Sequence, residues 1–307
     1  MNAQAYRPLT VAQTLARGIV ALAKAGDSPR SDALLLLAHV LGRERSWLVA
    51  HGETFLSKPQ AEKFTSLCHV RGTGMPLAYI LGTAGFYGRE FTVSDKVLVP
   101  RPETEHLVDE ALAHVKTRLN PNLPKQFVTA LDVGVGSGAI ACTIAAENAN
   151  VFVEGTDTSS AALKVAQHNA RRLNVIGRCR FHYGSLAMPV GDRQFDVVVA
   201  NLPYVPSADV PKPPDPAGFE PREALDGGPD GLKAYREFLP AAPSLLKPGG
   251  MLLLEAAPPV FDALAVLVGQ AFPRIDFEVG EDYAGLARYV KLVTPDELTR
   301  RPADHPR

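Results

Sequence analysis

The chain has 307 residues, enough for one large domain and a smaller companion. With 46% hydrophobic residues it resembles ordinary globular proteins, and its formal net charge of -1 gives no overall field that would draw it to nucleic acid or an anionic membrane. Its three cysteines lie far apart in the sequence and its eight histidines show no tight ligand spacing, so neither a disulfide framework nor a metal site is indicated. No signal pattern opens the sequence and no apolar run approaches the roughly 20 residues of a membrane helix, so we expect a cytoplasmic protein.

The first part of the chain, 1–82, is predicted to form a small helical bundle domain. Apolar residues recur at three- and four-residue spacing in TVAQTLARGIVALAKAG and SDALLLLAHVLG, and a third helical segment covers 58–71. The next stretch, 83–120, begins with two short alternating segments, FYGREFTV and KVLV, separated by Ser94-Asp95. This pattern predicts a hairpin, and a linker helix follows from about Glu103 to Leu119.

From 121 to 295, strand-like and helical runs alternate, which predicts an α/β domain with a parallel, Rossmann-like sheet and helices on both faces. The strand-like runs include FVTALDV, VFVEGTD, FDVVVAN and GMLLLEA. The last two runs, RIDFEV and ARYVKLV, have no long crossover between them, so we expect an antiparallel hairpin at the C-terminal end. The polar tail, 296–307, is expected to be mobile.

The segment LDVGVGSGA turns from a strand into a helix and predicts a cofactor loop. Its glycines let the backbone turn tightly and approach a ligand, and the helix N-terminus offers free N–H groups. The same spacing fits a dinucleotide loop, so the glycines alone leave NAD and S-adenosylmethionine open. The acid before the loop favours S-adenosylmethionine, because it can hold the positively charged amino group. The candidate cofactor residues here are Asp132, Gly134, Val135, Gly136, Ser137 and Gly138.

Asp157 ends the next strand-like run, about 20 residues beyond the loop, where an acid can accept hydrogen bonds from both ribose hydroxyls. Both candidate cofactors carry such a ribose. The alternative role for Asp157 is the N-cap of the helix that begins near Ser159. We favour ribose binding.

The run FDVVVAN leads into Asn201-Leu202-Pro203-Tyr204, which is close to the (D/N/S)-P-P-(Y/F/W) motifs of methyltransferases that act on planar amide or amino nitrogens. An amide nitrogen is a poor nucleophile and carries two N–H donors. We expect the Asn201 side-chain oxygen and the Leu202 carbonyl to accept one each, which aims the nitrogen at the methyl group. Tyr204 would offer a ring face near the sulfonium. These four residues, Pro203 included, are the candidate catalytic residues.

The chain resembles the HemK/PrmC-type protein glutamine methyltransferases in several specific segments: PLAYILGTAGFYG, VLVPRPETEHLVD, LDVGVGSGAIA, NLPY, EPREALDGGPDGL and DYAGLARYV. The resemblance implies S-adenosyl-L-methionine-dependent N5-methylation of the glutamine in the Gly-Gly-Gln motif of class I peptide chain release factors. A related branch methylates a ribosomal protein, but its PRPETE segment usually differs, so we favour the release factor. The resemblance also implies that the domain 1–82 helps to recognise this protein substrate. We expect a monomer with no stable nucleic-acid binding.

Two positions depart from the family pattern. Leu202 replaces the first proline of NPPY, so the carbonyl acceptor survives while a backbone restraint is lost and a flexible apolar side chain is added. Ser185 and Leu186 stand where the family often has an acid and a large residue beside the adenine. We expect the serine hydroxyl to bond the adenine amino group and the leucine to cover its face. No catalytic role is assigned to Glu255.

Three other functions remain as alternatives. A DNA adenine amino-methyltransferase would suit the NxPY chemistry, but neither a target-recognition domain nor a basic excess is apparent. An NAD-dependent oxidoreductase would leave NLPY, PRPETE and ALDGGPDGL without a purpose. A catalytically weakened binding protein would follow from the departures at Leu202 and Ser185. Arg101 and Glu103 of PRPETE are left outside the site, because a salt-bridged structural role explains them equally well.

Overall fold

The structure is a computed structural model that describes residues 7–25, 28–119, 126–282 and 285–296. The tail predicted to be mobile, 296–307, lies outside the described residues from 297 onward. Contacts divide the chain into two compact units. The first contains Met1–Thr83 together with Pro211–Phe219, and the second contains Ala84–Val210 and Glu220–Arg307. A short segment from the middle of the sequence therefore groups with the N-terminal helices.

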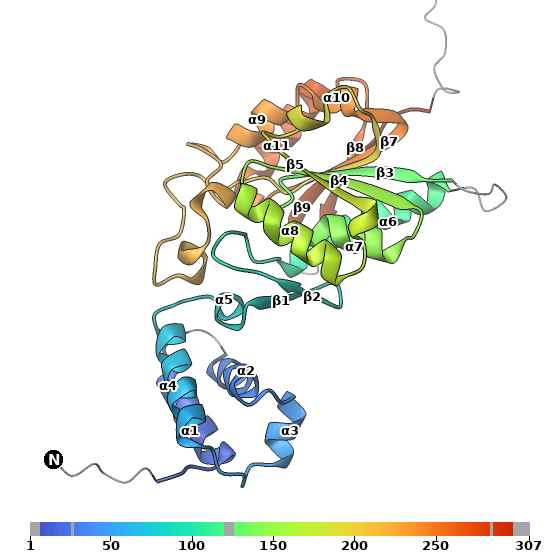
Figure 1. Cartoon of the computed structure of the whole chain (residues 1–307). Helices are drawn as coiled ribbons and strands as arrows, with labels where there is room; N and C mark the ends of the chain where they lie inside the picture. The colour runs from blue at the N-terminus through green and yellow to red at the C-terminus, as the bar shows by residue number, and fades with distance from the viewer. Residues whose placement is uncertain (1–6, 26–27, 120–125, 283–284, 297–307) are drawn as a thin grey trace, which may run out of the picture. The chain divides into compact units, whose positions relative to one another are not determined.

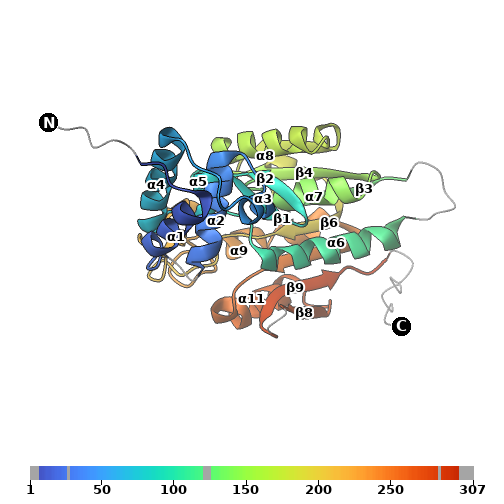
Figure 2. The same cartoon turned by 90° about the horizontal axis from the view of Figure 1, so that it is seen from below.

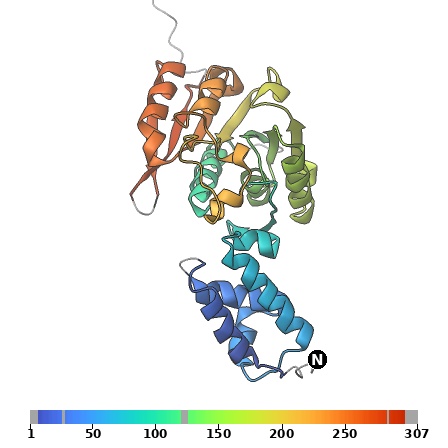
Figure 3. The same ribbon diagram turned by 90° about the vertical axis from the view of Figure 1, so that its left-hand side faces the viewer.

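The first unit is the predicted helical bundle (Figures 1 and 3). Its helices are α1 (Val11–Ala21), α2 (Pro29–Leu41), α3 (Arg45–Ala50), α4 (Lys58–Gly72) and α5 (Leu77–Leu81). Helices α1 and α4 begin with capping boxes, in which Thr10 and Gln13, and Ser57 and Gln60, satisfy one another's free backbone N–H groups. The apolar faces meet in a core that includes Leu22, Leu36, Leu37 and Phe64.

The segment Pro211–Phe219 is packed tightly within this first unit. Gly74 has φ of 95°, and a Cβ added to it would lie 1.9 Å from the carbonyl oxygen of Pro214. Only glycine fits such a close approach of two backbones. Nearby, Arg71 forms an ion pair with Asp32 at 2.7 Å and donates to the carbonyl of Met75 at 3.1 Å, which fixes the turn that leads to Gly74.

The predicted hairpin is present, but its turn and second strand were placed wrongly. The strands are β1 (Thr83–Phe86) and β2 (Arg89–Thr92), and the turn is Tyr87-Gly88, with φ of 50° and 68°. The segment KVLV is not a strand. Its apolar residues have another cause, because Val97 is buried and lines a pocket together with Leu98. The 3-10 turn η1 (Pro102–Thr104) and helix α6 (Glu105–Arg118) follow.

The second unit is built on a seven-stranded sheet with the order β5-β4-β3-β6-β7-β9-β8. Its strands are β3 (Val128–Val133), β4 (Val151–Asp157), β5 (Cys179–Tyr183), β6 (Phe195–Ala200), β7 (Leu246–Glu255), β8 (Phe277–Glu281) and β9 (Ala287–Val293). Neighbours from β5 to β7 pair in parallel, whereas β9 pairs antiparallel with both β7 and β8. The Rossmann-like sheet and the antiparallel C-terminal hairpin are thus confirmed.

Helices cover both faces of this sheet. One face carries α6, α7 (Ala139–Glu147) and α8 (Ser160–Arg172), which lie side by side in Figure 2. The other carries α9 (Lys233–Phe238), α10 (Ala242–Leu245) and α11 (Pro258–Ala271). Strand β6 is buried along its whole length, which explains its continuous apolar run. The remaining 3-10 turns are η2 (Ile176–Arg178), η3 (Met188–Val190), η4 (Pro216–Phe219) and η5 (Arg222–Ala224).

No helix in the described residues is long and apolar enough to cross a bilayer.

Candidate active site

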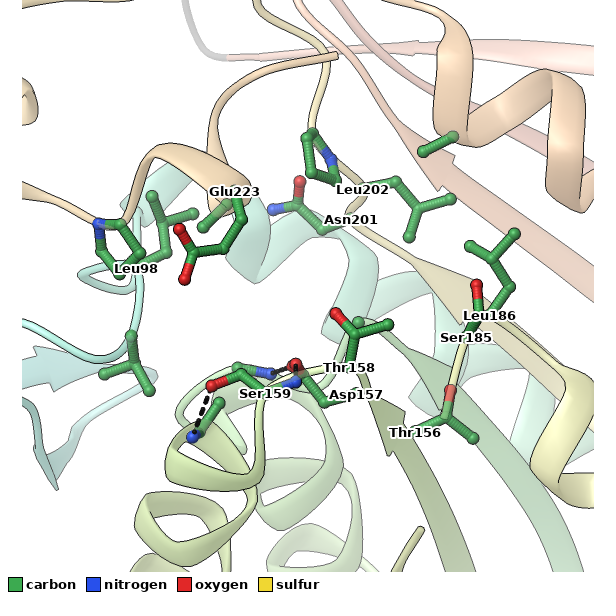
Figure 4. Close-up of a pocket in the computed structure, with 18 of the residues that line it drawn as sticks. Leu98, Thr156, Asp157, Thr158, Ser159, Ser185, Leu186, Asn201, Leu202 and Glu223 are labelled. Atoms are coloured by element: carbon green, nitrogen blue, oxygen red, sulfur yellow. Dashed lines mark hydrogen bonds between the residues drawn. The ribbon is translucent and has the colours of Figure 1, made fainter. Parts of the chain in front are cut away.

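A pocket of about 340 Å³ lies within the second unit, where the carboxyl ends of the central parallel strands meet. Strand β3 is flanked by β4 on one side and by β6 on the other, so the loops that follow these strands diverge around a crevice, the usual ligand position in such sheets. Figure 4 shows Asp157 and Ser159 on one side of this pocket and Asn201 and Leu202 across from them. Some of the predicted cofactor residues and some of the predicted substrate residues therefore line the same pocket.

The glycine loop after β3 has a backbone conformation that would be strained for residues other than glycine. Gly134, Gly136 and Gly138 have φ of 80°, 52° and 81°. The N–H groups of Gly134 and Val135 both donate to the carbonyl of Thr156 at 2.9 Å, which ties the loop to the end of β4. Gly134 and Gly136 line the pocket. Val135, Ser137 and Gly138 are not among its lining residues.

The predicted contact residue Asp132 lies deeper, with 1% of its surface exposed. Its Oδ2 accepts the N–H of Ala141 at 3.0 Å, while its Oδ1 has no hydrogen-bond partner among the described residues. Burial raises the pKa of this carboxyl to about 7. A buried acceptor without a donor suits a cationic amino group, which is what S-adenosylmethionine would bring.

Asp157 lines the pocket and holds its floor together. Its Oδ2 accepts the N–H of Gly136 at 2.9 Å, and its Oδ1 accepts the N–H of Ser159 at 2.8 Å. The N-cap of α8 is Ser159, whose hydroxyl accepts the N–H of Ala162 at 3.1 Å. The alternative role of Asp157 as this N-cap is therefore taken by another residue. Burial, which is the largest of several influences, raises the pKa of Asp157.

Ser185 and Leu186 also line the pocket, after β5 (Figure 4). The N–H of Gly184 donates to the carbonyl of Asp157 at 3.0 Å, so this loop is attached to the residue predicted to bind the ribose. Leu186 has φ of 49°, a left-handed conformation that is uncommon for a leucine. The two residues thus line the same pocket as Asp157, next to a loop that is bonded to it.

Asn201, Leu202 and Pro203 line the pocket, whereas Tyr204 is not among its lining residues. The Nδ2 of Asn201 donates to the Thr104 hydroxyl at 3.2 Å. Tyr204 is partly buried against the core between the sheet and helices α9, α10 and α11, and burial raises the pKa of its phenol to about 12. The structure therefore brings three of the four candidate catalytic residues to the pocket wall, whereas the tyrosine packs against the core.

The backbone at Leu202 has a restraint that the sequence did not suggest. Its N–H donates to the hydroxyl of Tyr235 at 3.3 Å, and this hydroxyl in turn donates to the carbonyl of Glu255. The leucine side chain is 4% exposed, and it packs where a Cβ on Gly134 would lie 3.3 Å from its Cδ2. The expectation of a flexible side chain at this position is therefore wrong, because the core holds it.

Other motif residues support the pocket. Arg101 of PRPETE forms an ion pair with Glu220, whose side chain is buried and also accepts the N–H of Val99 at 3.0 Å. The structural role considered for Arg101 is thus observed, with Glu220 as its partner. Leu98 and Glu223 line the pocket and were missed. Their only signal in the sequence was membership of the VLVPRPETEH and EPREAL segments.

Comparisons with known proteins show which family the chain is similar to. Residues 13–82 match the model of the PrmC N-terminal domain, and residues 125–266 match that of a methyltransferase domain. The release factor glutamine methyltransferase of Moorella thermoacetica is 38% identical over 91% of this chain and 97% of its own length. That of Geobacter sulfurreducens is 40% identical over 76% and 78%. A solved release factor-specific protein-(glutamine-N5) methyltransferase from Alicyclobacillus acidocaldarius is 27% identical, covers 67% of this chain and 99% of its own, and has a TM-score of 0.40. This chain belongs to the release factor glutamine methyltransferase family.

Proposed function

We propose that this chain transfers the methyl group of S-adenosyl-L-methionine to the side-chain amide nitrogen of the glutamine in the Gly-Gly-Gln motif of a class I peptide chain release factor. The observation that carries the proposal is the position of Asn201, which has its Nδ2 held by Thr104 and lies across the pocket from Asp157. The chain's membership of the family supports the choice of substrate.

The residues present fit the cofactor. Gly134 and Gly136 leave the backbone open to the pocket, and Asp157 would accept the ribose hydroxyls with the oxygen lone pairs not used by the protein. The unpaired Oδ1 of Asp132 would accept the amino group. Ser185 and Leu186 would bound the adenine. The bound cofactor supplies an electrophilic methyl group on a positively charged sulfur.

The chain's own residues orient the glutamine. The Oδ1 of Asn201 and the carbonyl of Leu202 would each accept one N–H of the substrate amide, which holds its nitrogen in line with the methyl carbon. As the nitrogen–carbon bond formed, the bond from the methyl carbon to the sulfur would break and leave the sulfur neutral, and the amide nitrogen would become cationic and then lose a proton to water. Each hydrogen bond to this developing charge is worth about 1.5–3 kcal/mol, more than the same bond to the neutral amide, so it lowers the barrier. Tyr204 would pack behind this pair.

The rest of the proposal concerns recognition. The substrate is a protein, and the domain 1–82 would recognise it, since this part matches the PrmC N-terminal domain. The stretch 83–120 would connect it to the catalytic domain, 121–295. We infer a monomer without stable nucleic-acid binding, active in the cytoplasm, where translation terminates.

Methyl transfer from radiolabelled S-adenosylmethionine to a purified class I release factor tests the proposal. A release factor whose Gly-Gly-Gln glutamine is changed to alanine is the matched substrate control, and Asn201→Ala is the matched enzyme control. We expect label only with the intact motif and the intact enzyme. Ribosomal proteins are assayed in parallel, and label on one of them instead of the release factor would assign the chain to the related branch. Label on neither the release factor nor a ribosomal protein would refute the proposed methylation of these substrates.

A further inference from the structure

Glu255, at the end of β7, is a buried acid that the mechanism above does not use. It is 3% exposed, and its Oε2 has no hydrogen-bond partner among the described residues. A carboxyl in such a position costs stability, so its presence beside the pocket needs an explanation. Strand β7 pairs with β6, which places Glu255 next to the Asn201 that follows β6.

The surroundings of Glu255 connect it to Asn201 directly. The Thr104 hydroxyl and the Asn201 side-chain amide lie close enough to lower the pKa of this carboxyl as donors. Thr104 also accepts from the Nδ2 of Asn201 at 3.2 Å. The nitrogen end of the amide is therefore turned toward Thr104, on the side of the carboxyl that it influences. The Oδ1 is left for the pocket, which is the orientation that a substrate N–H requires.

We propose that Glu255 is a positioning residue for methyl transfer, whose carboxylate holds the Nδ2 of Asn201 so that the Oδ1 faces the substrate amide. This inference rests on the proposed function of the pocket. A neutral carboxyl would weaken this arrangement, because its O–H is a donor and competes for the same Oδ1. The ionised form is thus the productive one.

The charge of Glu255 is sensitive to pH near neutrality. Burial, the largest influence, and the negative charge of Glu103 raise its pKa, and the net result of all influences is a pKa of about 7. Arg288 lowers it, as do the donors already named. The phenols of Tyr204 and Tyr235 face the same carboxyl from the loop after β6 and from α9, and both stay neutral because their own pKa values are raised. The step from neutral to ionised Glu255 therefore falls within the range of an enzyme assay.

The test compares the pH profile of kcat for release factor methylation in the wild type and in Glu255→Gln. Glutamine keeps an acceptor oxygen for Asn201 but does not titrate. Between pH 6 and pH 8 the ionised fraction of a group with a pKa of about 7 rises about tenfold, so we expect the ratio of wild-type to variant kcat to rise by a similar factor. A ratio that stays constant would overturn the proposal.

Two further variants separate positioning from folding. Glu255→Leu should lower kcat about tenfold at pH 8, where the wild-type carboxyl is ionised, while binding of S-adenosylhomocysteine stays at the wild-type affinity. Glu103→Gln removes a neighbouring negative charge without touching Asn201, so it should shift the pH step of the wild type to lower pH and keep its height. A Glu255→Leu enzyme with full kcat, or an unmoved step in Glu103→Gln, would count against the assignment.

A spectroscopic readout keeps the proposal testable even if the release factor is not the substrate. In protein labelled with nitrogen-15 at asparagine, the side-chain amide signal that is missing from Asn201→Ala should shift as the pH crosses about 7. The shift should be absent from Glu255→Gln. A signal that does not respond to pH in the wild type would refute the positioning role, whereas absent methylation with a normal shift would refute only the proposed substrate.

Discussion

The hydrogen bond between the Leu202 N–H and the Tyr235 hydroxyl yields a sharp prediction, because proline, the usual family residue at this position, has no N–H to donate. The perturbation is a double-mutant cycle of Tyr235→Phe and Leu202→Pro. In the wild type, Tyr235→Phe leaves two buried groups without a partner, the Leu202 N–H and the Glu255 carbonyl.

The magnitude follows from the cost of such groups. Leaving a buried donor or acceptor unsatisfied costs about 1–3 kcal/mol. In the Leu202→Pro background the N–H is already gone, so Tyr235→Phe should cost about 1–3 kcal/mol less than it costs in the wild type. Leu202→Pro alone should lower the free energy of unfolding by about 1 kcal/mol, because it empties part of the space over Gly134 that the leucine side chain fills.

Urea unfolding of the four proteins, monitored by far-ultraviolet circular dichroism, measures the free energies of unfolding. The kcat of each variant provides a second cycle, since a looser Leu202 carbonyl should slow methyl transfer more in the wild-type background than in the proline background. Equal costs of Tyr235→Phe in both backgrounds would refute the idea that this hydrogen bond replaces the restraint of the proline ring.

Three further predictions concern the cofactor, pH and the loop support. Asp157→Asn should weaken binding of S-adenosylhomocysteine by roughly tenfold or more, measured by calorimetry, because it removes a charge-assisted acceptor that also holds the glycine loop; unchanged affinity would exclude the ribose contact. Burial raises the pKa values of Asp132 and Glu255 to about 7, so the stability that their neutral forms contribute is complete below their unfolded pKa values and is lost as pH rises through about 7. Urea unfolding of the ligand-free protein should show this fall, and Glu255→Gln should reduce it; a rise in stability over this window would contradict the argument. Glu220→Gln should lower the free energy of unfolding by about 1–3 kcal/mol, because it weakens the bonds of a buried acid to Arg101. Arg101 is more exposed, so Arg101→Lys should lower the free energy of unfolding by less. Thermal unfolding compares the two variants, and a larger loss in Arg101→Lys would contradict the role of the buried Glu220.

The parts of the structure that could be predicted from the sequence are those encoded in consecutive residues. Alternating strand and helix runs indicated the parallel sheet, and polar residues where strands end, Asp157 and Asn201, indicated where the pocket lies. The hairpin turn was misplaced because Ser94-Asp95 has typical turn residues, whereas the real turn places Tyr87 at a positive φ. Local composition does not signal such a conformation for a tyrosine.

The residues that support the site could not be predicted in this way. Thr104 is 97 positions from Asn201, and Tyr235 is 33 positions from Leu202, so only the folded sheet brings them together. Glu255 ends an apolar strand, where an acid is equally consistent with a turn. A hydrogen bond between distant segments leaves no periodicity in the sequence, and its members are recognised only once the strand order is known.

The packing of Pro211–Phe219 against Gly74 has a consequence for exchanging parts between relatives. The chain passes between its two units at three points, after Thr83, after Val210 and after Phe219, so no single cut separates them. A fragment that starts at Ala84 would carry Pro211–Phe219 without the glycine that accommodates the Pro214 carbonyl. A chimera that borrows the N-terminal helices of another family member should therefore borrow this segment as well, or the two backbones will not fit.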